Sequence, residues 1–336
     1  MNLLWLLDQR TIHLITKMSR CAILDIGSNT SKLLVGESTP ERGLIELYQS
    51  SYSCRILNEK RDGNQLHISN DKITHLVRTV KKLCLEAEKF HPLSTYIVGT
   101  EALRITKNIS QVKQAILEET GLSLLVLSGI QEAEGIARGI TTDPKYHKLA
   151  DFHAFDLGGG SLEIIEVNRR NVTLTASLPL GSVALMQQLI PNRLNSIDKK
   201  LRSQVINSTR KMMAKAVPKL DKCKLLIASG GTIVHLKKAQ EVELSKQGNS
   251  KEYDGLNRLY IEDMANMMCD LDVNGRTKFF PSIPEDRLDI FPVGLLTILG
   301  VMDYLEVDEI FHTYNNLRYG IMAWPELLKK DTEGFI

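Results

Sequence analysis

The sequence predicts an α/β protein made of two related domains that pack around a cleft. The first reason is length, because 336 residues correspond to about two domains of ~150 residues each. The second is that strand-like and helix-like segments alternate along the chain, as in layered α/β folds. The third is a repeated pattern of apolar strand, aspartate and glycine turn, which occurs twice, 131 residues apart, at Asp25 and at Asp156.

Each copy of the repeat reads as a strand, a tight turn and a second strand. In the first copy, residues 20–24 lead into Asp25-Ile26-Gly27-Ser28-Asn29-Thr30, and apolar residues resume at 33–35. In the second, residues 153–155 lead into Asp156-Leu157-Gly158-Gly159-Gly160-Ser161, followed by 164–167. A spacing of this size is too long for a solenoid repeat of ~20–50 residues and favours two domains that open alike.

Between the copies we expect a helix at 71–90, strands at 95–98 and 122–127, and a helix at 132–140. After the second copy we expect a helix at 199–216, a strand at 224–228 and a glycine turn at 229–232. Because Asp143-Pro144 breaks the pattern, we place the domains at 18–140 and 141–336, with the last helix free to pack back on the first domain. For residues 1–17 we favour a leader upstream of a start at Met18, since they lack the features of an export signal.

Composition narrows the function classes. The 42 Lys and Arg nearly balance the 40 Asp and Glu, which argues against a nucleic-acid-binding protein. Five scattered cysteines without a CxxC pair favour reduced thiols and a cytoplasmic protein over disulfides or zinc. No apolar run approaches the ~20 residues of a membrane span. The basic stretch at 199–224 is interpreted as a solvated helix face, and a homodimer stays open.

Three glycine turns, each after an apolar strand, indicate phosphate binding. Glycine lets backbone N–H groups approach an anion, and Ser and Thr hydroxyls add donors. The candidate phosphate-binding residues are Ser28, Asn29, Thr30, Gly158, Gly159, Gly160, Ser161, Gly230 and Gly231. Asp25 and Asp156 stand at strand ends, where carboxylates could hold Mg²⁺ beside the phosphate, although aspartate also caps turns. The chain contains no P-loop, GxGxxG, HExxH or GxSxG motif.

The duplicated hairpins resemble the phosphate loops of the actin-like ATPase superfamily. Five segments in order resemble one branch of it, the exopolyphosphatase and guanosine pentaphosphate phosphatase (Ppx/GppA) family in its short two-domain form; they begin at Asp25, Gly99, Leu127, Asp156 and Ser177. The resemblance implies two actin-like (ribonuclease H-like) domains around an interdomain cleft. It also implies Mg²⁺-dependent hydrolysis of terminal phosphoanhydrides in inorganic polyphosphate or guanosine pentaphosphate.

The resemblance assigns roles to individual residues. Glu132 matches the general base for the attacking water, and Asp156 and Glu163 match acidic positions near metal and water. Arg104 matches an arginine expected to contact a phosphate. Three positions depart from the family pattern: Gln131 replaces the first of two glutamates, Ala184 replaces a basic residue, and residues 313–320 differ from a Ser-x-x-Gly-Leu-Arg-Glu-Gly segment.

We therefore expect a hydrolase that releases terminal orthophosphate from polyphosphate, with guanosine pentaphosphate as the alternative substrate. A phosphotransferase like the kinases of this fold is a second hypothesis. A third is a non-catalytic regulator that binds a nucleotide or alarmone, which Gln131 keeps open.

Overall fold

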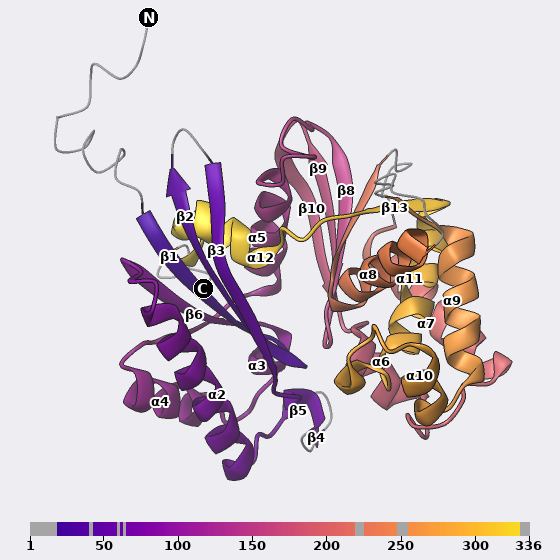
Figure 1. The fold of residues 1–336 in the computed structure, drawn as a ribbon, viewed down its shortest axis with the longest axis horizontal. Helices are drawn as coiled ribbons and strands as arrows, with labels where there is room; N and C mark the ends of the chain where they lie inside the picture. Colours follow the sequence, from indigo (N-terminus) through magenta and orange to yellow (C-terminus); the bar gives the residue numbers. More distant parts are fainter. Residues whose placement is uncertain are drawn as a thin grey trace, which may run out of the picture.

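The computed structural model describes residues 19–39, 43–58, 61–62, 65–218, 225–246 and 255–329. The expectations for residues 1–17 and for Cys223 lie outside these ranges. The chain forms two mixed sheets, each with helices packed on it (Figure 1).

The first sheet has five strands in the order β3-β2-β1-β6-β7. Its strands are β1 (Ser19–Ile26), β2 (Thr30–Thr39), β3 (Gly43–Ser53), β6 (Ser94–Gly99) and β7 (Leu124–Val126). The helices of this half are α2 (Asn70–Glu88), α3 (Glu101–Arg104) and α4 (Ile109–Thr120), with the short η2 (Ile56–Asn58), β4 (Arg61–Asp62) and β5 (Gln65–Leu66). α2 begins at the cap Ser69, and its apolar positions are buried at helical spacing, as the sequence predicted.

The second sheet has six strands in the order β10-β9-β8-β11-β13-β12. They are β8 (Phe152–Leu157), β9 (Leu162–Asn168), β10 (Asn171–Leu178), β11 (Leu226–Gly230), β12 (Gly255–Asn257) and β13 (Glu309–His312). Its helices are α6 (Ser182–Leu189), α7 (Lys199–Ala216), α8 (Gly231–Lys246), α9 (Arg258–Asp270), α10 (Val273–Phe279) and α11 (Phe291–Leu305), with η3 (Glu285–Arg287).

The most apolar segment of the chain is a core helix. α11 is buried over almost its whole length and packs against α7 and α9. Pro292 is tolerated because it lies in the first turn, where its missing N–H has no helical partner. Among the described helices, none is long and apolar enough to cross a membrane.

The two hairpins have the same turn. In the first, the Gly27 N–H donates to the carbonyl of Thr30 over 3.1 Å, and in the second Gly158 donates to Ser161 over 3.0 Å. The repeat expected from the sequence is therefore a structural repeat. The third glycine segment differs from the expected turn, because β11 continues through Gly230 and α8 begins at the next residue.

One helix crossing joins the two halves. α5 (Gly129–Thr141) packs against α12 (Leu317–Ala323), which also lies on β1 and β2 and is followed by η4 (Pro325–Lys329), as Figure 1 shows. The backbones touch at glycines: a β-carbon on Gly320 would lie less than 3.0 Å from the carbonyl of Gly135. One on Gly139 would lie equally close to the carbonyl of Asn316. Side chains at these positions would force the helices apart.

We expect Gly320→Ala to destabilise the fold by about 3 kcal/mol, since an added methyl group in a packed contact cannot be absorbed by a flexible side chain. Urea unfolding followed by circular dichroism measures the loss. Gly121→Ala is the control: its φ is +70° but its β-carbon would meet nothing within 4 Å. That variant should lose only about 1 kcal/mol through backbone strain. Equal losses in the two variants would contradict the close crossing.

Candidate active site

The glycine turns of the two hairpins face each other across a narrow cleft. A β-carbon on Gly160 would lie 2.5 Å from the Ser28 Oγ, and one on Gly159 would lie 3.4 Å from the Asn29 Cβ. The cleft encloses about 70 Å³. Its lining includes residues of both turns, together with Asp25, Lys32, Thr100, Glu132, Asp156, Gly231, Thr232 and Arg287.

The backbone groups of both turns, which line this cleft, are hydrogen-bonded in the same way. The carbonyls of Ser28 and Asn29 accept hydrogen bonds from residues 54–57, and those of Gly158–Gly160 accept from residues 181–184. The corresponding N–H groups, from Ser28, Asn29, Gly159 and Gly160, donate to no acceptor within the described part of the chain. Buried or half-buried N–H groups without partners are costly. Four of them, in two loops that line one cleft, are candidate donors for an anion.

Three side-chain atoms of the cleft lining also lack partners. Within the described ranges, the buried Asn29 Nδ2, Asp25 Oδ1 and Asn316 Oδ1 make no hydrogen bond. An amide nitrogen is a donor for a phosphate oxygen or a water, whereas a carboxylate oxygen is a ligand for a cation. The cleft thus presents unused groups of both kinds.

The aspartates at the ends of β1 and β8 lie in one buried charge cluster. Burial raises the pKa of Asp25 and of Asp156, and the cations of Lys32 and Arg318 act in the opposite direction. The Ser229 hydroxyl also donates to Asp156. No group of three or more potential metal ligands occurs in the described residues. Two carboxylates suit Mg²⁺, which keeps several of its waters.

Glu132 lies at the start of α5, buried beside Arg104. Its Oε2 is 2.6 Å from the Arg104 Nη1, and the same guanidinium donates to Glu101 and to the Leu127 carbonyl. Burial, followed by repulsion from Glu163, raises the pKa of Glu132 well above its usual value, while Arg104 opposes that rise. In this structure Arg104 positions Glu132, and its expected contact with a phosphate stays a prediction.

The neighbouring Gln131 has a different role. Ser128 Oγ accepts the N–H of Gln131, and Gln131 Oε1 accepts the N–H of Ser128 over 2.8 Å. Glutamine and glutamate serve equally at this position of a capping box. The departure at Gln131 therefore affects the cap of α5 and leaves the buried carboxylate of Glu132 in the cleft.

Glu163 is almost completely buried on β9. Burial and the neighbouring Asp156 raise its pKa to about 7, although hydrogen bonds from Ser161 and Ser177 favour the charged form. The Ser177 hydroxyl donates to Glu163 over 2.8 Å and contacts Arg104. Glu132 and Glu163 are thus two carboxyl groups that lie close enough to repel each other when ionised, and Arg104 stabilises the ionised form of both.

The remaining residues that the sequence assigned to phosphate binding line the cleft, with one exception. Thr30, Gly158, Ser161 and Gly231 line the cleft with the other turn residues, whereas Gly230 is absent from its lining. Gly230 has φ +105°, and a β-carbon there would collide with the Leu157 carbonyl, so it serves the contact between β11 and β8.

Sequence reasoning missed three cations. Lys32 and Arg287 line the cleft, and Arg287 donates to the Thr30 hydroxyl over 2.7 Å. Arg318, on α12, is buried and donates to the Leu33 carbonyl over 2.9 Å. For Lys32 a signal existed, because it lies 131 residues before Glu163 in the repeat.

Comparisons with a family model, with relatives and with solved structures agree with the resemblance found in the sequence. The model of the Ppx/GppA phosphatase family matches residues 46–327. A Haemophilus influenzae relative, provisionally named an exopolyphosphatase, is 24% identical over 90% of each chain. A Vibrio parahaemolyticus guanosine-5'-triphosphate,3'-diphosphate pyrophosphatase is 27% identical over 90% of this chain, which spans 58% of that relative's length. The structure of an exopolyphosphatase from Cytophaga hutchinsonii superposes with a TM-score of 0.79, at 20% identity, over 93% of this chain and 98% of that one. This likeness shows the two-domain actin-like fold.

Because the pKa of Glu163 is raised from 4.5 to about 7, the unfolded chain ionises this carboxyl before the folded protein does, and the stability it contributes at low pH is lost as the pH rises from about 4.5 to about 7. Replacement by Gln removes that loss, so Glu163→Gln should gain stability relative to the unmodified protein as the pH rises from 5 to 8. The shift corresponds to about 2 kcal/mol, measured by urea unfolding with EDTA present. Glu166→Gln, on the same strand but half-buried, is the control. A gain independent of pH would show that Glu163 ionises normally.

Proposed function

The chain belongs to the Ppx/GppA phosphatase family, and we propose that it releases terminal orthophosphate from inorganic polyphosphate. The observation that carries this proposal is that four residues with unpaired amide N–H groups line a cleft that also holds a buried glutamate. That arrangement offers donors for phosphate oxygens and an acceptor for the proton of a water.

In the proposed reaction, the terminal phosphate lies between the two glycine turns. Their N–H groups, with Asn29 Nδ2, Lys32 and Arg287, hold its oxygens. A water oxygen attacks the terminal phosphorus in line with the bridging oxygen, the bridging P–O bond breaks, and the shortened chain leaves with the electron pair. Glu132 accepts the proton of the water, and Arg104 keeps its carboxylate in place. Arg104 also favours the ionised form of Glu132 that this step needs, against burial and the neighbouring Glu163, which raise its pKa.

We propose Mg²⁺ as the cofactor, held by Asp25 and Asp156. The unpartnered Asp25 Oδ1 and the all-oxygen donor set support this choice. Bound Mg²⁺ would neutralise charge on the phosphate oxygens.

Guanosine pentaphosphate is the alternative substrate. The name of the Vibrio parahaemolyticus relative favours it, and its 5'-triphosphate presents the same terminal phosphoanhydride to the cleft. Polyphosphate is preferred because the lining of the cleft includes no aromatic side chain to bind a base. The capping role of Gln131 weakens the non-catalytic alternative, since the proposed base does not depend on it.

Glu132→Gln should lower phosphate release from long-chain polyphosphate by ~10²–10⁴-fold, because the amide cannot accept the proton. Phosphate is measured in Mg²⁺ buffer, with guanosine pentaphosphate compared in parallel. The matched control is Glu134→Gln, on the same helix but outside the cleft, which should retain activity. Without release from either substrate by the unmodified protein, the hydrolase proposal fails.

Asp156→Asn should raise the Mg²⁺ concentration needed for half-maximal activity by about tenfold or more, since one of two anionic ligands is lost. Activity is titrated with MgCl₂ at a fixed polyphosphate concentration. Asp151→Asn, on the surface just before β8, serves as the control. An unchanged Mg²⁺ dependence in Asp156→Asn would rule out this residue as a ligand.

A further inference from the structure

A second cavity lies on the side of α5 that faces away from the catalytic cleft. Its volume is about 720 Å³, within the ~300–1,000 Å³ range of small-molecule sites. α5 contributes Ile130, Glu134, Ala137, Arg138 and Thr141 to its lining. At 100° per residue, this stripe is centred about 180° from Glu132 on the helix. The cavity is therefore separate from the proposed catalytic cleft although both use α5.

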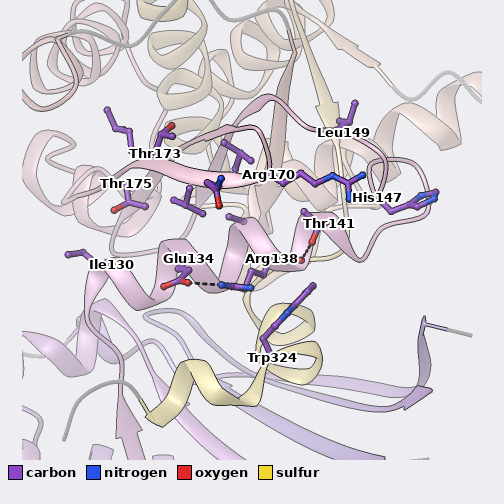
Figure 2. Close-up of a pocket in the computed structure, with 15 residues that line it drawn as sticks. Ile130, Glu134, Arg138, Thr141, His147, Leu149, Arg170, Thr173, Thr175 and Trp324 are labelled. Atoms are coloured by element: carbon purple, nitrogen blue, oxygen red, sulfur yellow. Dashed lines mark hydrogen bonds and ion pairs between the residues drawn. The ribbon is translucent and has the colours of Figure 1, made fainter. Parts of the chain in front are cut away.

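Basic side chains from three segments surround this cavity. Figure 2 shows Arg138 on α5, Arg170 at the β9–β10 hairpin and His147 in the loop after α5. Glu134 is the one acidic residue of the lining, and it pairs with Arg138 over 3.0 Å. The guanidinium of Arg170 makes no ion pair with any residue that the structure describes, and the Arg138 Nε is buried without a partner there. The cavity thus has donors left for an anion.

The hairpin that carries Arg170 has an unusual backbone. Arg169 and Arg170 both have positive φ, 50° and 63°, in the two-residue turn between β9 and β10. Two-residue hairpin turns with positive φ favour Asn and Gly. Any other type of residue with such a φ costs about 1–3 kcal/mol of folding free energy. Strain of this kind is typical of functional sites. Here it places a long cationic side chain at the rim of the cavity.

An aromatic ring completes the lining. Trp324, which follows α12, lies 5.3 Å from the Arg138 guanidinium carbon, measured to the ring centroid. Figure 2 shows it on the opposite side of α5 from the hairpin, next to Arg138. Tryptophan offers a face or an edge to a planar ring, and stacking on aromatic side chains is a general way to bind bases.

We propose that this cavity binds a nucleotide, with the base against Trp324 and the phosphates at Arg138 and Arg170. A nucleotide combines a planar ring with negative charge, as the lining does. Polyphosphate, which has no ring, would leave Trp324 without a role. The site is independent of the proposed hydrolysis, since none of its residues lines the catalytic cleft.

The experiment uses Trp324 as a reporter. The chain has two tryptophans, Trp5 and Trp324, so Trp5→Phe leaves Trp324 as the single one. In this full-length background, combined with Glu132→Gln to prevent turnover, ADP and GDP are titrated while fluorescence is recorded. We expect saturable quenching by at least one of them, and much weaker binding of tripolyphosphate and of the free nucleosides.

Two variants of the hairpin turn test the contact. Arg170→Asn should weaken nucleotide binding by about tenfold, since a charged hydrogen bond is lost. Arg169→Asn removes the same charge from the same turn but lies outside the cavity lining, so it should bind as the parent does. Asn suits positive φ, so both variants should keep the turn.

Three results would overturn the proposal. These are the absence of saturable quenching by both nucleotides, equal binding of tripolyphosphate, or equal effects of the two turn variants. Because binding is measured without turnover, loss of the hydrolase proposal would leave this test intact.

Discussion

The contact between α5 and α12 is the constraint on which the site depends. Gly135 and Gly139 on one helix and Gly320 on the other allow backbone to meet backbone. This closeness brings a helix from the end of the chain onto β1 and β2, at the start of the chain. α12 places Arg318 near the buried aspartates Asp25 and Asp156. α5 places Glu132 in the cleft, one turn before the crossing. Two charged side chains from distant parts of the sequence are thereby placed by one packing contact.

The two hairpins have the same backbone turn but carry side chains of opposite charge at one equivalent position. Lys32 pairs in register with Asp25 across the first hairpin, and Glu163 pairs with Asp156 at the equivalent position of the second. The cation lowers the cost of burying Asp25, whereas the second carboxyl raises the cost of ionising Glu163. A duplicated anion-binding turn has thus acquired a basic wall on one side and an acidic wall on the other. Phosphoryl transfer needs both.

Sequence alone could predict the fold and both hairpin turns, because strand, glycine turn and strand are local patterns. It could also identify Glu132, whose neighbours form an ordered motif. It could not show that Arg104 holds a glutamate, that Arg287 reaches the cleft, or that Arg318 donates to the Leu33 carbonyl, since these contacts join segments up to 285 residues apart. Gly230 shows why a glycine alone is ambiguous, because close strand contact and phosphate binding both require it, and in the structure Gly230 lies against β8 and not in the lining of the cleft. In the sequence, Gln131 suggests the loss of a catalytic carboxylate, whereas in the structure its side chain caps the start of α5.

The polar groups of the cleft that lack hydrogen-bond partners in the described residues favour two ligands of opposite charge. Four carboxyl groups, from Asp25, Asp156, Glu132 and Glu163, share a buried region, and burial raises the pKa of each. Carboxylate oxygens favour a cation, and Asp25 Oδ1 has no partner among the described residues. The unpaired amide N–H groups beside them favour an anion, and no single ion satisfies both. A cation and a phosphate bound together would satisfy the donors and the acceptors at once, each lowering the cost of burying the other's partners. Under the proposed function, a metal ion and a phosphate would therefore each make binding of the other more favourable.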